Sequence, residues 1–128
     1  MELKTKLYLV DEDGNKFMGI GVLWLLEQVQ QQNSLRKAAS ELGISYSKAF
    51  GMVQNLERGL GVPVLNRRKG GASREGATLT EFALQFLVLY RQFTKQAKGS
   101  LSAPFSQFKK ELGDLLEAYD ESGGEGNE

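Results

Sequence analysis

The stretch from Ser34 to Glu57 limits the possible folds of this chain more than any other part of it. Ser34 is a candidate N-cap, since its hydroxyl can accept from a free amide, and apolar residues then recur at helical spacing as far as Leu42. Gly43 follows, and glycine can adopt the left-handed backbone that ends a helix. Ser45 can cap a second helix. The pattern predicts two short helices joined by a tight turn, a helix-turn-helix.

The second helix of this motif has an outward face of unusual chemistry. With Ala49, Phe50 and Val53 turned inward at about 100° per residue, the outward face carries short side chains, amides and cations, and no carboxylate. Amides can pair with adenine edges, lysine with guanine, and glycine permits close backbone approach. Many helical hairpins with a glycine turn bind nothing, so the motif alone leaves that alternative open. If the helix enters the DNA major groove, we expect these residues to contact bases: Ser47, Lys48, Gly51, Gln54 and Asn55.

A strand, a basic loop and a second strand follow the motif. Two glycines and Pro63 end the second helix, residues 64–67 and 77–79 can pair as strands, and basic, glycine-rich residues 68–76 join them. A glycine-rich loop can also cradle a nucleotide phosphate, but residues 69–71 lack the spacing of a P-loop. The order is that of a wing, which can lie along the phosphates or enter the minor groove. We expect DNA backbone contacts from Ser34, Arg36, Lys37, Tyr46, Arg58, Arg67, Arg68, Lys69 and Arg74.

The charge distribution agrees with a nucleic-acid partner although the net charge is zero. Residues 1–33 carry three cations and five acids, and residues 80–128 carry five cations and eight acids. Residues 34–79 carry eight cations and three acids, so the positive charge is concentrated in the motif and the predicted wing. The local field, rather than the net charge, decides where an anionic polymer binds.

The segment before the motif predicts a β-hairpin and one further helix. Residues 3–10 alternate as a half-buried strand does, residues 11–15 form an acidic turn, and residues 16–18 can return as a short strand. The turn offers too few ligands for a metal loop, so we interpret it as a solvated tip. A helix is expected over residues 22–32, in which Trp24 more often packs in a core than stacks on a ligand.

The segment after the wing predicts two amphipathic helices and a tail. Thr80 can cap a helix from Glu81 to about Lys98, residues 99–104 predict a break, and residues 105–119 a last helix. Residues 120–128 are acidic and glycine-rich, which is typical of disorder. Both helices carry more apolar surface than a small domain can cover, although the last one could fold onto its own domain. For a homodimer interface we expect Phe82, Phe86, Leu89, Tyr90, Phe93, Phe105, Phe108, Leu112, Leu115 and Leu116.

The composition argues against several other classes of protein. Cysteine and histidine are both absent, so disulfides, thiolate metal sites and the commonest catalytic bases are missing, and we expect no enzyme, cofactor or metal. The sequence contains no run of about 18 apolar residues, so we expect no segment that spans a membrane. Met1 leads directly into charged residues, from which we expect a cytoplasmic, nucleoid-associated protein without a secretory signal.

Three segments together resemble a known family. Residues 34–39, 42–46 and 60–65 are similar to the winged helix shared by LysR-type and ModE-type bacterial regulators. Gly70-Gly71-Ala72 and Gly76-Ala77-Thr78-Leu79-Thr80 favour ModE, in which a glycine-rich wing precedes a long helix. The resemblance covers roughly residues 3–98, and it implies a homodimeric transcription factor that binds double-stranded DNA. The chain is too short to hold the molybdate-binding domains of ModE, so we do not expect molybdate to bind it.

We therefore expect a mainly α fold with small β elements (α+β), a winged helix-turn-helix with an N-terminal hairpin and C-terminal dimerisation helices. The expected division is a DNA-binding domain over residues 1–79, a helical dimerisation segment over residues 80–119 and a disordered tail over residues 120–128. An alternative is a winged-helix adaptor for protein partners that has lost DNA binding, because a fold alone does not fix a function.

Overall fold

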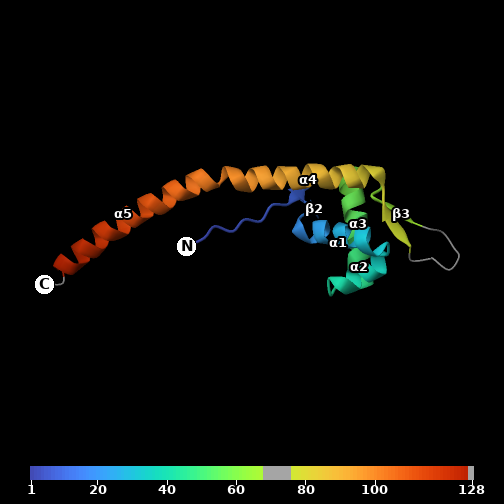
Figure 1. Cartoon of the computed structure of the whole chain (residues 1–128), viewed down its shortest axis with the longest axis horizontal. Coiled ribbons are helices and arrows are strands. Elements are labelled where there is room, and N and C mark those ends of the chain that lie inside the picture. Colours follow the sequence, from blue (N-terminus) through green and yellow to red (C-terminus); the bar gives the residue numbers. More distant parts are fainter. Residues whose placement is uncertain (68–75, 127–128) are drawn as a thin grey trace. The chain divides into compact units, whose positions relative to one another are not determined.

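A computed structural model describes the backbone of residues 1–67 and 76–126 and the side chains of residues 1–66 and 76–120. Five helices and four short strands follow one another along this part of the chain (Figure 1). Their order is β1 (Leu9–Val10), β2 (Lys16–Met18), α1 (Ile20–Gln32), α2 (Leu35–Glu41), α3 (Tyr46–Leu60), β3 (Leu65–Arg67), β4 (Ala77–Leu79), α4 (Glu81–Ser100) and α5 (Ser102–Gly126). The expected mainly helical fold with two small antiparallel sheets is confirmed.

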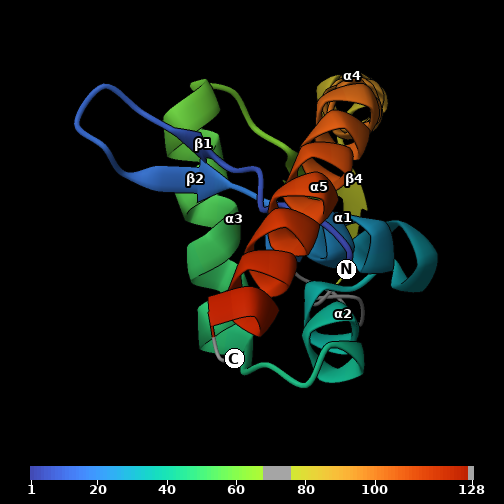
Figure 2. The same ribbon diagram turned by 90° about the vertical axis from the view of Figure 1, so that its left-hand side faces the viewer.

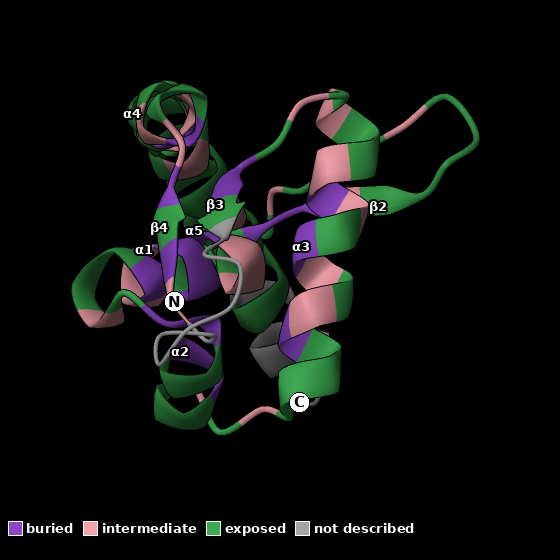
Figure 3. Cartoon of the chain, turned by 90° about the vertical axis from the view of Figure 1, so that its right-hand side faces the viewer, coloured by how far each residue is buried: buried purple, intermediate pink, exposed green. Residues whose placement is uncertain are grey.

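The core lies among α1, α2 and α3 and the start of α4. Its largest fully buried side chains include Leu25 and Leu26 of α1 and Val53 and Leu56 of α3. In Figure 3 the buried residues of α3 follow one side of the helix, and exposed residues occupy the other. This separation is the amphipathic pattern that the spacing predicts.

The ends of the motif helices are set by local hydrogen bonds. The Ser34 hydroxyl accepts from the amide of Lys37 at 3.1 Å, and the Ser45 hydroxyl accepts from the amide of Lys48 at the same distance. Both serines are therefore the predicted N-caps, each satisfying a first-turn amide. Gly43, between the two helices, has a φ of 69°, a left-handed conformation that glycine adopts without steric cost.

The first strand is much shorter than residues 3–10, so that prediction is wrong in its extent. Only Leu9–Val10 pair with β2, because β2 has just three residues and the chain turns into α1 after Gly19. Among the residues that the structure describes, no further strand is left for the earlier residues to pair with. The hydroxyl of Tyr90 donates instead to the carbonyl of Leu7 at 3.3 Å.

The hairpin formed by β1 and β2 packs on the second half of α3 (Figure 2). The Asn55 amide donates to the carbonyl of Lys16 at 2.6 Å. One turn further along α3, a Cβ atom on Gly59 would overlap the ring of Phe17. The hairpin therefore needs a residue without a side chain at position 59.

The base of the wing is present as expected. Strands β3 and β4 pair in the register Leu65 with Leu79 and Arg67 with Ala77. Thr80 closes this unit, because its amide donates to the carbonyl of Val64 at 3.0 Å and its hydroxyl donates to the carbonyl of Pro63 at 3.0 Å. The loop between the strands, residues 68–75, lies outside the described residues.

The two C-terminal helices differ from the prediction at their boundaries. Only Leu101 separates α4 from α5, where we expected a break over residues 99–104. Pro104 lies in the first turn of α5, where its missing N–H removes no helical hydrogen bond. The backbone of α5 continues to Gly126, beyond the expected end at residue 119, and residues 127–128 are outside the described part.

The chain divides into two compact units, residues 6–91 and residues 1–5 with 92–128. The first unit extends beyond residue 79 because α4 contributes Ala83, Leu87 and Tyr90 to its core. Within the described residues, the longest helices are too polar for any of them to cross a bilayer.

The contact between Gly59 and Phe17 predicts opposite effects for two glycine substitutions in α3. Gly59→Ala should lower the free energy of unfolding by about 1–3 kcal/mol, because the new methyl group must displace Phe17. Gly51→Ala is the matched control: nothing lies within 4 Å of a Cβ there, so the better helix propensity should stabilise by up to about 1 kcal/mol. Urea unfolding measures both, and equal effects would contradict the contact.

The hairpin turn predicts an unusually acidic aspartate. A backbone hydrogen bond from Asn15 is the main cause that lowers the pKa of Asp11 below 3.8, aided by the Asn15 side chain and the Asp13 amide. Because the folded-state pKa is depressed, the hairpin should be stabilised at neutral pH and lose this stabilisation as the pH falls through the folded-state pKa. NMR titration should show the Asp11 carboxyl protonating below the ordinary aspartate pKa of about 3.9, and a midpoint at or above that value would refute the turn geometry.

Candidate nucleic-acid interface

The first half of α3 presents an open, carboxylate-free face. Ser47, Lys48, Gly51 and Gln54 are all exposed. A Cβ atom on Gly51 would meet nothing within 4 Å, so a partner could approach the backbone closely at that position. The structure thus brings four of the five residues expected to contact bases onto one accessible surface.

The fifth residue, Asn55, is held within the protein. Its side-chain nitrogen donates to the Lys16 carbonyl, and its side-chain oxygen accepts from Arg58 at 3.4 Å. Asn55 is accordingly only partly exposed. In this structure its amide holds the hairpin on α3, a role that helical spacing could not reveal because the partner lies 39 residues away in the sequence.

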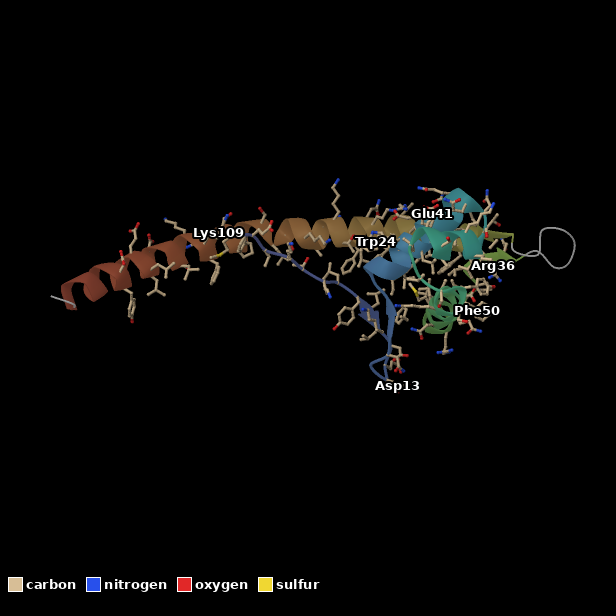
Figure 4. All side chains as sticks on the ribbon, turned by 90° about the horizontal axis from the view of Figure 1, so that it is seen from below. Asp13, Trp24, Arg36, Glu41, Phe50 and Lys109 are labelled. Carbon is tan, nitrogen blue, oxygen red and sulfur yellow. The ribbon has the colours of Figure 1, made fainter. Side chains whose placement is uncertain are left out.

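An aromatic stack orders the junction between α2 and α3. The Arg36 guanidinium lies over the ring of Tyr46, 4.3 Å from its centroid, and the Tyr46 ring stacks with Phe50 at 6.1 Å and 30°. Arg36 and Phe50 come from neighbouring helices, as Figure 4 shows. When a guanidinium stacks on a ring, its flat face contacts the ring and its N–H groups point outward in the guanidinium plane. In that orientation the N–H groups suit hydrogen bonds to phosphate oxygens.

The remaining residues expected at the DNA backbone differ in their accessibility. Lys37 and Arg58 are exposed, whereas Ser34 is buried with 6% exposure and serves as the cap of α2. Arg67 lies at the end of β3 and its side chain is not described. The expected wing contacts Arg68, Lys69 and Arg74 fall outside the described residues.

The base of the wing is tied to the helix-turn-helix by contacts that the sequence analysis missed. A carboxylate oxygen of Glu57 in α3 accepts from the amide of Val64 at 2.8 Å. At the other strand, the amide of Ala77 donates to the carbonyl of Asn33 at 3.1 Å. Glu57 is one of only three acids in the otherwise basic residues 34–79, and this rarity could have indicated from the sequence that it has a specific structural role.

The residues of α4 that are expected at a dimer interface fall into two groups. Phe82, Leu89 and Phe93 are exposed, and Phe82 stacks on Phe86 with 6.2 Å between ring centroids. Tyr90 is buried with 6% exposure, and this burial raises the pKa of its hydroxyl. Tyr90 therefore belongs to the core of its own unit, because it points toward the segment that leads into β1.

Trp24 does not pack in the core, so that expectation is wrong. The Trp24 side chain is 52% exposed, because Leu23, Leu25, Leu26 and Val29 already fill the inward side of α1. Near it, Arg91 donates to a carboxylate oxygen of Glu27 at 2.8 Å, and these three residues line the same shallow depression.

The fold and this surface define a winged helix-turn-helix domain of the kind found in transcriptional regulators. The family described as bacterial regulatory helix-turn-helix protein, lysR family, matches residues 21–84, half of the chain. The chain belongs to that family, and the sequence-based prediction of a ModE- and LysR-like domain is confirmed.

Two curated relatives are proteins named ModE. The chain is 33% identical over 66 residues to the transcriptional regulator ModE of Haemophilus influenzae, an alignment that covers 52% of this chain and 26% of that protein. It is 22% identical over 95 residues to the molybdenum transport protein ModE of Azotobacter vinelandii, covering 74% and 35%. The matched segment is therefore no more than about a third of either relative.

Two similar solved structures are DNA complexes. The CbnR_DBD–DNA complex is 29% identical with a TM-score of 0.52, covering 65% of this chain and 90% of that one. The complex of BenM_DBD with catB site 1 DNA is 26% identical with a TM-score of 0.50, covering 66% and 86%. These likenesses support the winged-helix fold and lead to the function proposed below.

The stack of Arg36 on Tyr46 predicts that an aromatic ring at position 46 positions the guanidinium. Tyr46→Phe should leave DNA affinity nearly unchanged, whereas Tyr46→Leu should weaken it about 2–5-fold, since a cation–π contact at an exposed site contributes about 0.5–1 kcal/mol. Binding titrations in an Arg36→Ala background provide the control, where the two Tyr46 variants should bind alike. A persisting difference in that background would show that Tyr46 acts independently of Arg36.

Proposed function

We propose that this protein is a sequence-specific transcriptional regulator that binds double-stranded DNA as a homodimer. The observation that carries the proposal is the accessible, carboxylate-free face of α3 in a lysR-family domain. An α-helix fits the major groove, and helices of this motif contact base edges with their N-terminal residues. That is the half of α3 that the hairpin leaves uncovered.

The residues on this face divide by the contacts that their chemistry allows. Lys48 can donate hydrogen bonds to a base edge, and Gln54 can both donate to a base edge and accept from it. Ser47 can also donate or accept, and Gly51 has no side chain to keep a base pair away. Arg36 and Lys37, near the start of α2, suit the phosphates beside the groove. The wing would contact the backbone or minor groove through Arg67, Arg68, Lys69 and Arg74.

Two symmetry-related copies are favoured by the apolar surface of α4. Phe82 and Leu89 are 42% and 64% exposed, although both are strongly apolar, and their spacing of seven residues puts them on one side of the helix. Exposed apolar residues gathered on one side of a helix mark an interaction site. We assign it to a second copy of the chain, which would give the regulator two-fold symmetry.

Molybdate sensing is not part of the proposal. The similarity to the ModE proteins covers 26% and 35% of their lengths. We also assign no enzymatic activity, because the described residues of the candidate site do not combine a nucleophile, a base and a charge-stabilising group as an active site does.

Selection of bound sequences from a random pool of double-stranded DNA tests this proposal. We expect a palindromic site, because the symmetry of the operator follows that of the protein. The logarithm of the affinity should fall linearly with the logarithm of salt concentration, with a slope of about −0.9 for each phosphate neutralised. No enrichment at low salt, together with a stoichiometric protein partner, would favour the adaptor alternative instead.

Two lysine variants separate base contacts from backbone contacts. Lys48→Ala should change the preferred sequence, and Lys37→Ala should weaken all sequences alike and reduce the salt slope by about 1. Lys110→Ala, on α5, removes the same charge outside the proposed interface and should do neither. Uniform weakening by Lys48→Ala would place that lysine on the backbone rather than on a base.

A further inference from the structure

The depression beside Trp24 is a feature of the domain that the proposed DNA contact does not use. Its volume of about 460 Å³ falls within the range of about 300–1,000 Å³ that is typical of small-molecule sites. It is lined by side chains of α1, of the end of α2 and of α4: Trp24, Glu27, Gln28, Gln30, Gln31, Leu42 and Arg91. All of them belong to the unit of residues 6–91, and none to α3 or the wing strands, so the depression is distinct from the candidate nucleic-acid interface.

A half-exposed indole ring gives the depression its apolar part. Trp24 lies on the outward side of α1, where Figure 4 labels it, and Leu42 is the other apolar side chain of the lining. An exposed aromatic ring offers a flat face on which a planar group can stack, and nucleobases stack on aromatic side chains in this way. The depression therefore favours a ligand with a flat ring.

Amide side chains follow the indole along the same side of α1. Gln28 and Gln31 come four and seven residues after Trp24, a spacing that places the three residues on one side of the helix. Helical side chains lean toward the N-terminus, so both amides lean toward the indole. The Gln28 oxygen accepts from Gln32 at 3.4 Å, whereas the Gln31 amide makes no hydrogen bond to any residue that the structure describes. An amide presents an acceptor and two donors side by side, and it can pair with the edge of an adenine base.

The charges in the lining cancel each other. Arg91 donates to one carboxylate oxygen of Glu27 from its Nε at 3.2 Å and from a terminal nitrogen at 2.8 Å. No other residue of this lining is charged. Because each charge of the pair offsets the field of the other, the depression offers little attraction to a free anion or cation. An uncharged ligand with several polar groups suits it better.

We propose that this depression binds an uncharged purine nucleoside. The two fused rings of the base stack on Trp24, the amides of Gln28 and Gln31 pair with the edge of the base, and the sugar hydroxyls face the Arg91–Glu27 pair. A purine is favoured over a pyrimidine because its larger ring covers more of the indole and because adenine places a donor beside an acceptor for an amide. The proposal does not depend on DNA binding.

The single tryptophan of the chain reports on the ligand directly. Adenosine is titrated into the full-length protein while the fluorescence of Trp24 is recorded. We expect saturable quenching by adenosine and about 5-fold weaker binding of cytidine, since an amide paired with adenine discriminates against the wrong base. Quenching that never saturates, or equal binding of the two nucleosides, would overturn the proposal.

Glutamine variants test the contact with the base while the fluorescent ring stays in place. The double variant Gln28→Ala with Gln31→Ala should weaken adenosine binding about 5-fold or more, because the base edge loses its amide partners. Gln96→Ala removes an exposed glutamine of α4 outside the depression and should bind adenosine as the unmodified protein does. Alanine is a good helix former, so the helices should persist in all variants, which circular dichroism checks. Unchanged binding by the double variant would refute the amide contact and with it the proposal.

Anionic ligands test the uncharged character of the ligand. Since the charges of the lining cancel, AMP and an oligo(dA) strand should bind no tighter than adenosine, compared base for base. Tighter binding of either one would identify a phosphate-binding site or a strand-binding site, and it would overturn the assignment to a free nucleoside.

Discussion

The packing of the β1–β2 hairpin on α3 decides which part of that helix a partner can reach. The Asn55 amide and the bare backbone of Gly59 hold the hairpin against the second half of α3. On the first half, the outward side with Ser47, Lys48 and Gln54 remains exposed. A helix that binds in a groove needs one half that is accessible to the partner and one half that is packed against its own domain. The packed half keeps the orientation of the helix fixed when the other half binds.

The wing depends on the same helix for its position. Glu57 of α3 accepts from the amides of Val64 and Leu65, so a carboxylate of this helix fixes the start of β3. The backbone contact between Asn33 and Ala77 fixes β4 beside the start of α2. Helix and wing are thus joined by hydrogen bonds to backbone groups, which position the strands whatever side chains the loop carries.

The C-terminal helices have a different energetic role from the core. The first half of α4 completes the core with Ala83, Leu87 and Tyr90, while other apolar residues of α4 and α5, among them Leu89 and Leu115, remain exposed. Exposed apolar surface is costly in water and is stabilised when covered. The domain can therefore fold around α1 to α3 and still keep apolar faces available for association.

Local pattern in the sequence determined the helices, their serine caps, the glycine turn and the strands at the base of the wing, because propensity and periodicity act over a few residues. It also placed Lys48 and Gly51 on the outward side of α3. Only the tertiary structure decided that Asn55 holds the hairpin, that Glu57 holds the wing, that Tyr90 is buried and that Trp24 is exposed. Each of these depends on contacts with residues distant in sequence, and helical spacing shows which residues share a face but not what covers that face.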